Sequence, residues 1–301
     1  MTRGDEPRGT GDGAPGSSPL FQASRPPASR SGRLLFAVVG LTLVALGVGF
    51  AARSRSTRKA APAAPIARPA PTPIEVPEGA MVRVAGGSFD MGSDDGEPDE
   101  RPVTRVTVAP FEIDTTEVTV AAYTKCVTAG KCAAPDTGMY CNWKKPDKAA
   151  HPINCVDFAE AGRYCTFVGK RLPTEPEWEI AARGLDGRKY PWRDGPPADN
   201  LCWSGDGNDQ GRGNRQGTCP VASYPAGASP SGALDMAGNV WEWTASPHCP
   251  YSTPGCGSDR FVIRGGAWNN LDPAYVRAQD RARESPKARP DNVGVRCARS
   301  P

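Results

Sequence analysis

The segment GALDMAGNVWEWTAS, residues 232–246, predicts a tight turn that leads into a buried strand. Gly238 and Asn239 favour a turn with positive φ, because glycine and asparagine tolerate that backbone conformation better than other residues. Side chains alternate between the two faces of an extended chain, so Trp241 and Trp243 point to the same face. Two large aromatic side chains on one face are typical of anchors in a packed core.

Oxygen atoms that suit Ca²⁺ lie on both sides of this turn. The carboxylates of Asp235 and Glu242 flank it, and the backbone carbonyls of Gly238 and Val240 lie between them. Ca²⁺ prefers such hard oxygen ligands. The residues of the turn are thus compatible with a calcium site, although an ordinary packed turn is the favoured interpretation from these residues alone.

Short strands are predicted near both ends of the cysteine-rich part of the chain. Residues 81–92 and 105–114 have alternating apolar side chains, and an acidic loop separates them. The segments FVIRGGAW, residues 261–268, and NVGVRCAR, residues 292–299, predict the last strands.

Two segments predict helices. Residues 156–169 have apolar side chains spaced by three and four, with Asp157 as the N-cap. In the following segment Thr174 and Glu177 fit a capping box, and Gly184 fits a C-terminal stop. Few helices among many short strands and loops predict an α+β fold.

Three segments precede this domain, which we place at residues 80–301. Residues 1–33 are rich in Gly, Ser, Pro and Arg and have too few large apolar side chains to fold. Residues 34–52 carry no charge and would cross a membrane as a helix, with a cleaved signal peptide as the alternative. Residues 53–79 form an Ala/Pro-rich linker, a composition that is typical of semi-rigid spacers.

The cysteines indicate the compartment of the domain. All ten lie between Cys126 and Cys297, and an even number confined to one segment predicts disulfides formed in an oxidising environment. Zinc thiolates are the alternative, but the sequence has no CxxC pair and only two histidines. The formal net charge of +3 gives no indication of nucleic-acid binding.

The orientation of the predicted anchor rests on two opposing signals. More Lys and Arg residues follow the span than precede it, which alone would place the C-terminal side in the cytoplasm. Five cytoplasmic disulfides would be unusual, so we give the cysteines more weight. We predict a single-pass membrane protein whose domain faces the periplasm or the exterior.

Four blocks of sequence together resemble the formylglycine-generating enzymes, the sulfatase-modifying factor family. The blocks follow the family order, span about residues 80–299, and imply the C-type-lectin-like fold of that family, with little regular secondary structure. They are residues 86–123, residues 151–184, residues 232–246, and residues 262–268 with 292–299.

The resemblance implies calcium at the four turn residues named above and at a second place. That second site would involve Asn200 and Leu201, with ligands from the glycine-rich loop that follows. Gly213 stands where the family has an acid, so Asp206 or Asp209 would have to replace it. A solvated loop is the alternative there.

Family resemblance and proximity in the sequence also suggest disulfide pairs. The expected pairs are Cys165 with Cys297, Cys202 with Cys219, and Cys249 with Cys256. The other four cysteines, Cys126, Cys132, Cys141 and Cys155, allow three connectivities, which stay open.

The metal chemistry of the family's enzymes is where this sequence departs from the pattern. Those enzymes oxidise a substrate cysteine with two active-site cysteines that hold copper(I). Here the two positions are Asn270 and Tyr275, and the preceding serine is Ala267. Neither side chain supplies the soft thiolate that copper(I) needs, so we expect no copper. Iron is not expected either, because a facial triad needs two histidines. The resemblance implies a structural role for His151, and His248 lies in a segment expected to be closed by a disulfide.

Two classes of function follow. The first is a membrane-tethered, non-oxidising relative that binds a ligand, or a protein or peptide partner, in the cleft that the enzymes use. The second is an enzyme that forms formylglycine by an altered route or uses another cleft chemistry. No catalytic residue is assigned. The residues expected near the old active site are Asn270, Asp272, Tyr275, Arg277 and Arg283.

Overall fold

The computed structural model describes residues 72–205 and 215–301. The expected disordered segment 1–33, the expected anchor 34–52 and most of the linker 53–79 lie outside these ranges. Within the described ranges, no helix is long and apolar enough to cross a membrane.

The described part mixes short strands and short helices, in agreement with the expected combination of helix and sheet. The strands are β1 (Met81–Val84), β2 (Gly87–Met91), β3 (Thr104–Val108), β4 (Phe111–Asp114), β5 (Trp241–Pro247), β6 (Phe261–Arg264), β7 (Arg281–Glu284), β8 (Val293–Gly294) and β9 (Ala298–Arg299). The α-helices are α1 (Val120–Thr128), α2 (Phe158–Phe167) and α3 (Glu175–Arg183), and the 3-10 helices are η1 (Pro98–Glu100), η2 (Pro225–Gly227) and η3 (Pro273–Val276).

Each of the two predicted N-terminal strand segments divides into two strands. Residues 81–92 form β1 and β2, which separate at Gly86. There φ is +72°, and a Cβ would lie 2.4 Å from the carbonyl oxygen of Val108. Residues 105–114 belong to β3 and β4, with a break at Pro110. Because β1 pairs with β4 and β2 pairs with β3, the two breaks let one apolar pattern serve two sheets.

The predicted helices α2 and α3 are confirmed. The carboxylate of Asp157 caps α2 by accepting a hydrogen bond from the backbone N–H of Glu160. Thr174 begins α3 with the expected capping box, and Gly184 ends it with φ of +68°. Helix α1 was not expected from the sequence. It begins after Thr119, whose hydroxyl accepts from the backbone N–H three residues later, as in other N-caps.

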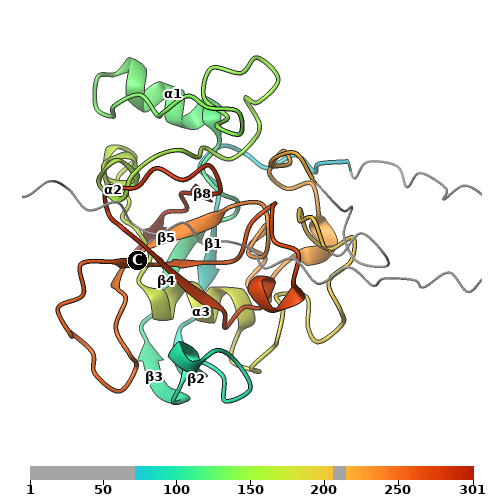
Figure 1. The fold of residues 1–301 in the computed structure, drawn as a ribbon, viewed down its shortest axis with the longest axis vertical. Coiled ribbons are helices and arrows are strands. Elements are labelled where there is room, and N and C mark those ends of the chain that lie inside the picture. Colours follow the sequence, from blue (N-terminus) through green and yellow to red (C-terminus); the bar gives the residue numbers. More distant parts are fainter. Residues whose placement is uncertain (1–71, 206–214) are drawn as a thin grey trace, which may run out of the picture. The chain divides into compact units, whose positions relative to one another are not determined.

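Strand β5 lies inside a four-stranded sheet in the order β7-β6-β5-β8, and a second sheet has the order β1-β4-β9. In Figure 1, β1, β4 and β5 cross the middle of the domain, with α1 at one end and the β2–β3 hairpin at the other. The turn before β5 has the predicted positive φ at Gly238 (+76°) and Asn239 (+60°). Trp241 and Trp243 are both buried, as predicted.

A fully buried ion pair joins β5 to the end of the chain. The guanidinium of Arg296 donates to both carboxylate oxygens of Glu242, at 2.8–3.0 Å. The indole N–H of Trp178 on α3 donates to the same carboxylate at 2.6 Å. The remaining Arg296 donors bind the backbone carbonyls of Asp114 and Leu234, each at 2.8 Å. One pair of charges therefore connects four parts of the chain that are distant in sequence: the end of β4, α3, the segment from Leu234 to Glu242, and the segment around Arg296.

Five disulfides close the described part of the chain and include the three expected pairs. They are Cys126–Cys132, Cys141–Cys155, Cys165–Cys297, Cys202–Cys219 and Cys249–Cys256. The first two settle the connectivity that the sequence left open. Cys165–Cys297 closes the longest loop and, in the chain-entropy model, stabilises the fold by about 4–5 kcal/mol. Five disulfides indicate an oxidising environment outside the cytoplasm.

We predict that Arg296→Met destabilises the protein by about 3–5 kcal/mol, because it leaves the Glu242 carboxylate buried without its partner. The control is Arg299→Ala, which removes a surface pair with Glu112 and should cost less than about 1 kcal/mol. Urea unfolding under oxidising conditions measures both. Equal losses in the two variants would show that the buried pair has no special role.

Candidate functional site

Three of the five residues expected near the family's active site line one cleft of about 540 Å³. These three are Asn270, Tyr275 and Arg283. We call this hollow the cleft. Its other lining residues are Glu97, Pro98, Asp99, Trp241, Asp280, Arg281 and Ala282.

Different parts of the fold supply the walls of the cleft. Trp241 opens β5, and Arg281 and Arg283 lie on β7 of the same sheet. Tyr275 belongs to η3, and the acidic loop before β3 supplies Glu97 and its neighbours. The side chains of β7 alternate, so Arg281 and Arg283 share one face of the sheet.

Asn270 closes the turn that follows β6. Its side-chain oxygen accepts from the backbone N–H of Ala267 at 2.6 Å, and its own N–H donates to the Ala267 carbonyl at 3.1 Å. Its carbonyl accepts from the N–H of Gly205. This residue therefore shapes the cleft through the backbone, a role that needs no metal.

Tyr275, at the second copper position of the family, is 46% exposed at the edge of the cleft. The described ranges contain all ten cysteines, and every one of them is in a disulfide. The described residues therefore bring no free thiol to the cleft.

Asp280 is a buried acid in the wall of the cleft. Burial, followed by the nearby Glu100 carboxylate, raises the pKa of Asp280 to about 8, while Arg277 and Arg264 act in the opposite direction. Its Oδ2 atom has no hydrogen-bond partner among the described residues. At neutral pH this carboxyl is mostly protonated, so the cleft contains a group that can hold and release a proton near physiological pH.

The other two expected residues, Asp272 and Arg277, line a neighbouring hollow of about 590 Å³ on the other side of η3. Asp272 caps η3 by accepting from the backbone N–H of Ala274 at 2.8 Å. Arg277 is buried and donates to both carboxylate oxygens of Glu100, at 2.6 and 3.0 Å. The structure therefore gives Arg277 a partner in the acidic loop, and it separates both residues from the other three.

Arg281 connects the cleft to Glu175 on α3 and to the segment around Cys249. One nitrogen of its guanidinium donates to the carbonyls of Asp99 and Cys249, at 2.8 and 3.0 Å, and the other donates to Glu175 at 2.8 Å. The Asp99 side chain accepts from His248 at 3.0 Å, and this hydrogen bond holds the pKa of Asp99 below its usual value. Asp99 and Arg281, which both line the cleft, are therefore held in place by the segment that begins at His248.

At the turn expected to bind calcium, the side chain of Glu242 is committed to other partners. Both of its oxygens accept hydrogen bonds from Arg296 or Trp178, as described above. Arg296 supplies the positive charge that a cation would otherwise supply. A calcium site at this turn would therefore depend on Asp235 and on the carbonyls of Gly238 and Val240.

Asp235 lies beside a second buried acid. It has φ of +58° and accepts from the backbone N–H of Ala222 at 2.6 Å, and burial raises its pKa to about 6. Glu117, which accepts from Asn239 at 3.0 Å, has a pKa raised well above its ordinary value by burial and by Asp235. Its other oxygen has no partner among the described residues. Two adjacent buried acids are compatible with a cation, but no group of three or more His, Cys, Asp or Glu suited to a metal occurs in the described ranges.

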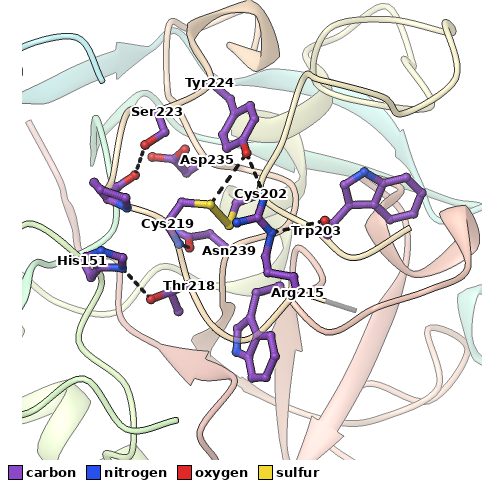
Figure 2. Close-up of a disulfide and its surroundings, with 12 residues drawn as sticks. His151, Cys202, Trp203, Arg215, Thr218, Cys219, Ser223, Tyr224, Asp235 and Asn239 are labelled. Carbon is purple, nitrogen blue, oxygen red and sulfur yellow. Dashed lines mark hydrogen bonds between the residues drawn. A yellow bond between two sulfur atoms is a disulfide. The ribbon is translucent and has the colours of Figure 1, made fainter. Parts of the chain in front are cut away.

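Asn239 and Asp235 lie close to the disulfide between Cys202 and Cys219, as Figure 2 shows. The side-chain oxygen of Asn239 accepts from the backbone N–H of Cys219 at 2.9 Å. The hydroxyl of Tyr224 contacts Cys219 Sγ at 3.7 Å. This disulfide fixes both ends of the glycine-rich loop against the turn before β5.

The second expected calcium site lies in that loop and is only partly described. Asn200 donates to the Ala226 carbonyl at 3.4 Å, and Leu201 is buried. Asp206 and Asp209 lie outside the described residues. This site stays a prediction.

Several residues of the site were not singled out from the sequence. Trp241 was expected as a core anchor but also lines the cleft. Glu97 and Asp99 were expected only as part of an acidic loop. Asp280 had a weak signal, a single acid among three arginines in VRAQDRAR, whose charge could have suggested a buried network.

Comparisons with known proteins identify the family of the chain. The family model described as sulfatase-modifying factor enzyme 1-like domain matches residues 67–301. The chain is 35% identical over 273 residues to the inactive C-alpha-formylglycine-generating enzyme 2 of Mus musculus, covering 73% of this chain and 86% of that protein. It is 34% identical over 306 residues to the formylglycine-generating enzyme of Streptomyces coelicolor, covering 81% and 94%. The structure of PvdO from Pseudomonas aeruginosa superposes with a TM-score of 0.62 at 27% identity, covering 76% of this chain and 99% of PvdO.

We predict that Asp280 makes stability fall with rising pH. The unfolded carboxyl loses its proton near pH 4 and the folded one near pH 8, so its contribution is full below pH 4 and is lost as pH rises to 8. Between pH 6 and pH 8 the free energy of unfolding should fall by up to about 1.4 kcal/mol per pH unit from this group. Urea unfolding at pH 6, 7 and 8 should show that Asp280→Asn lacks this part of the slope. Identical slopes would mean that Asp280 titrates normally.

Proposed function

The chain belongs to the family of sulfatase-modifying factor enzyme 1-like domains, and from this premise we propose that it is a non-oxidising member that binds a protein or peptide in the cleft. One observation carries the proposal. The two positions at which the family's oxidases hold copper(I) are Asn270 and Tyr275, and all ten cysteines of the chain are in disulfides. A site without thiolates lacks the ligands that copper(I) requires.

The character of the cleft supports a polypeptide ligand. The exposed ring of Tyr275 offers apolar contact area beside the largely buried Trp241, and aromatic side chains are enriched where proteins bind one another. Glu97 and the exposed Arg283 add one charge of each sign. A segment of chain with apolar and charged side chains suits this lining better than a small ion of one charge.

The name of one relative points in the same direction. The mouse protein is called inactive, and it shares about a third of its aligned residues with this chain. The Streptomyces relative, which is named as an enzyme, is almost equally similar. Overall identity therefore does not decide whether this chain is an enzyme or an inactive relative, and the proposal rests on the residues of the cleft.

We propose that the domain works outside the cytoplasm, attached by a membrane anchor at residues 34–52. The five disulfides support an oxidising environment. The length and apolar character of residues 34–52 support the anchor. We also propose that the fold of the domain is C-type-lectin-like.

An enzyme is the second candidate, and Asp280 is the observation that favours it. Its pKa of about 8 would let it act as a proton donor or acceptor near neutral pH. Arg283 and Tyr275 line the same cleft. Any such reaction would use proton transfer and positioned charge in place of a copper-thiolate centre.

The first test offers the purified full-length protein copper(I), oxygen and a cysteine-containing sulfatase-type peptide. We expect no aldehyde product in the mass spectrum of the peptide, because the cleft lacks the metal ligands. The Streptomyces relative, treated in the same way, is the positive control. Aldehyde formed at a rate comparable to that control would make the chain an oxidase and would refute the proposal.

We also propose calcium at the turn before β5, with Asp235 and the carbonyls of Gly238 and Val240 as donors. In a melting experiment, millimolar Ca²⁺ should raise the melting temperature of the wild-type protein relative to a chelator, because a ligand that binds only the folded state stabilises it. Asp235→Asn should remove most of this shift. A wild-type melting temperature that does not respond to Ca²⁺ would exclude the site.

A further inference from the structure

We propose that the disulfide between Cys249 and Cys256 is a thiol-exchange site, and that its opening loosens one wall of the cleft. An external thiolate would attack Sγ of Cys256, with a dithiol as the complete reductant. The exchange itself is independent of the proposed function. Its consequence concerns the same cleft and would hold for a binding protein or for an enzyme.

Exposure distinguishes Cys256 from every other cysteine of the chain. All ten cysteines are described, nine of them are buried, and Cys256 alone is exposed. The disulfide between Cys126 and Cys132 closes a loop of similar length, with a sequence separation of 6 against 7. In that disulfide Cys126 is 0% exposed and Cys132 is 7% exposed. Because thiol–disulfide exchange requires access for the attacking thiolate, the short loop alone does not make a disulfide reactive.

The geometry also gives the reaction a direction. Cys249 is only 7% exposed, so an attacking thiolate reaches Cys256. The backbone N–H of Cys256 donates to Cys249 Sγ at 3.0 Å, and a hydrogen bond of this kind stabilises the thiolate that leaves. Attack at Cys256 therefore releases Cys249.

The reduction takes place in two successive thiol–disulfide exchange steps. The first thiolate of the dithiol forms a mixed disulfide with Cys256, and the bond to Cys249 breaks with its electron pair on Cys249. The second thiol of the reductant then loses its proton and displaces Cys256. The dithiol becomes a disulfide by losing two electrons, and the two cysteines take up protons and become thiols.

Three contacts connect this disulfide loop to the cleft. The carbonyl of Cys249 accepts from Arg281 at 3.0 Å, and the ring of Tyr251 lies 4.2 Å from the Arg281 guanidinium carbon. His248, the residue before the loop, contacts the Asp99 carboxylate at 3.0 Å. Arg281 and Asp99 both line the cleft. A loop freed by reduction would remove support from these two residues, while Arg281 keeps its bond to Glu175.

The first experiment treats the native full-length protein with increasing dithiothreitol, followed by alkylation and peptide mapping. We expect Cys249 and Cys256 to be alkylated at a reductant concentration about tenfold lower than the other eight cysteines, because access limits the exchange. Hydrogen exchange of the selectively reduced protein should increase in residues 97–100 and 248–260. Reduction of another pair first, or of all five together, would overturn the proposal. Unchanged exchange in residues 97–100 would overturn the connection to the cleft.

Two matched variants test the direction of attack. Cys249→Ser leaves Cys256 as an exposed thiol, and Cys256→Ser leaves Cys249 as a buried one. Both variants open the same loop, so they differ only in the sulfur that remains. With glutathione disulfide, the first variant should form a mixed disulfide about tenfold faster than the second. Equal rates, or a faster reaction of Cys256→Ser, would contradict attack at Cys256.

Discussion

The buried pair between Glu242 and Arg296 is the interaction on which the rest of this domain depends. Taking two charges out of water is costly, and such a pair is tolerable only when the remaining donors and acceptors are also satisfied. Here Trp178 and two backbone carbonyls complete most of that set. The residue after Arg296 is Cys297, which is bonded to Cys165 on α2. The turn, the end of the chain and two helices are thereby fixed to one another.

The cleft is built on this frame but uses different residues. Trp241 precedes Glu242 on β5, so the buried pair positions a cleft wall without itself facing the cleft. The same pair bears on the calcium prediction, because Arg296 already neutralises one of the carboxylates assigned to the metal. A second buried ion pair, between Glu100 and Arg277, holds the acidic loop against the end of η3. Scaffold and cleft thus depend on separate sets of charges, and the cleft chemistry could change while the fold was kept.

Local signals in the sequence predicted the local structure well. The N-caps at Asp157 and Thr174 and the positive φ at Gly238 depend on residues only a few positions away. Helix α1 has a comparable N-cap at Thr119, although no helix was predicted there. The strand pairing was not predictable, because breaks at Gly86 and Pro110 send one apolar pattern into two sheets.

The site was predictable only where family blocks or short spacing fixed it. Asn270, Tyr275 and Arg283 line the same cleft, whereas Asp272 and Arg277, at the two ends of η3, line the neighbouring hollow. Asp280 had only a weak signal, since its raised pKa comes from burial in the folded chain and from Glu100, which is far away in sequence. The most direct test of the account is a competition titration of the oxidised protein with copper(I). We predict no binding by the wild-type protein and one copper(I) per molecule after Asn270→Cys with Tyr275→Cys. Tight stoichiometric binding by the wild-type protein would contradict the account.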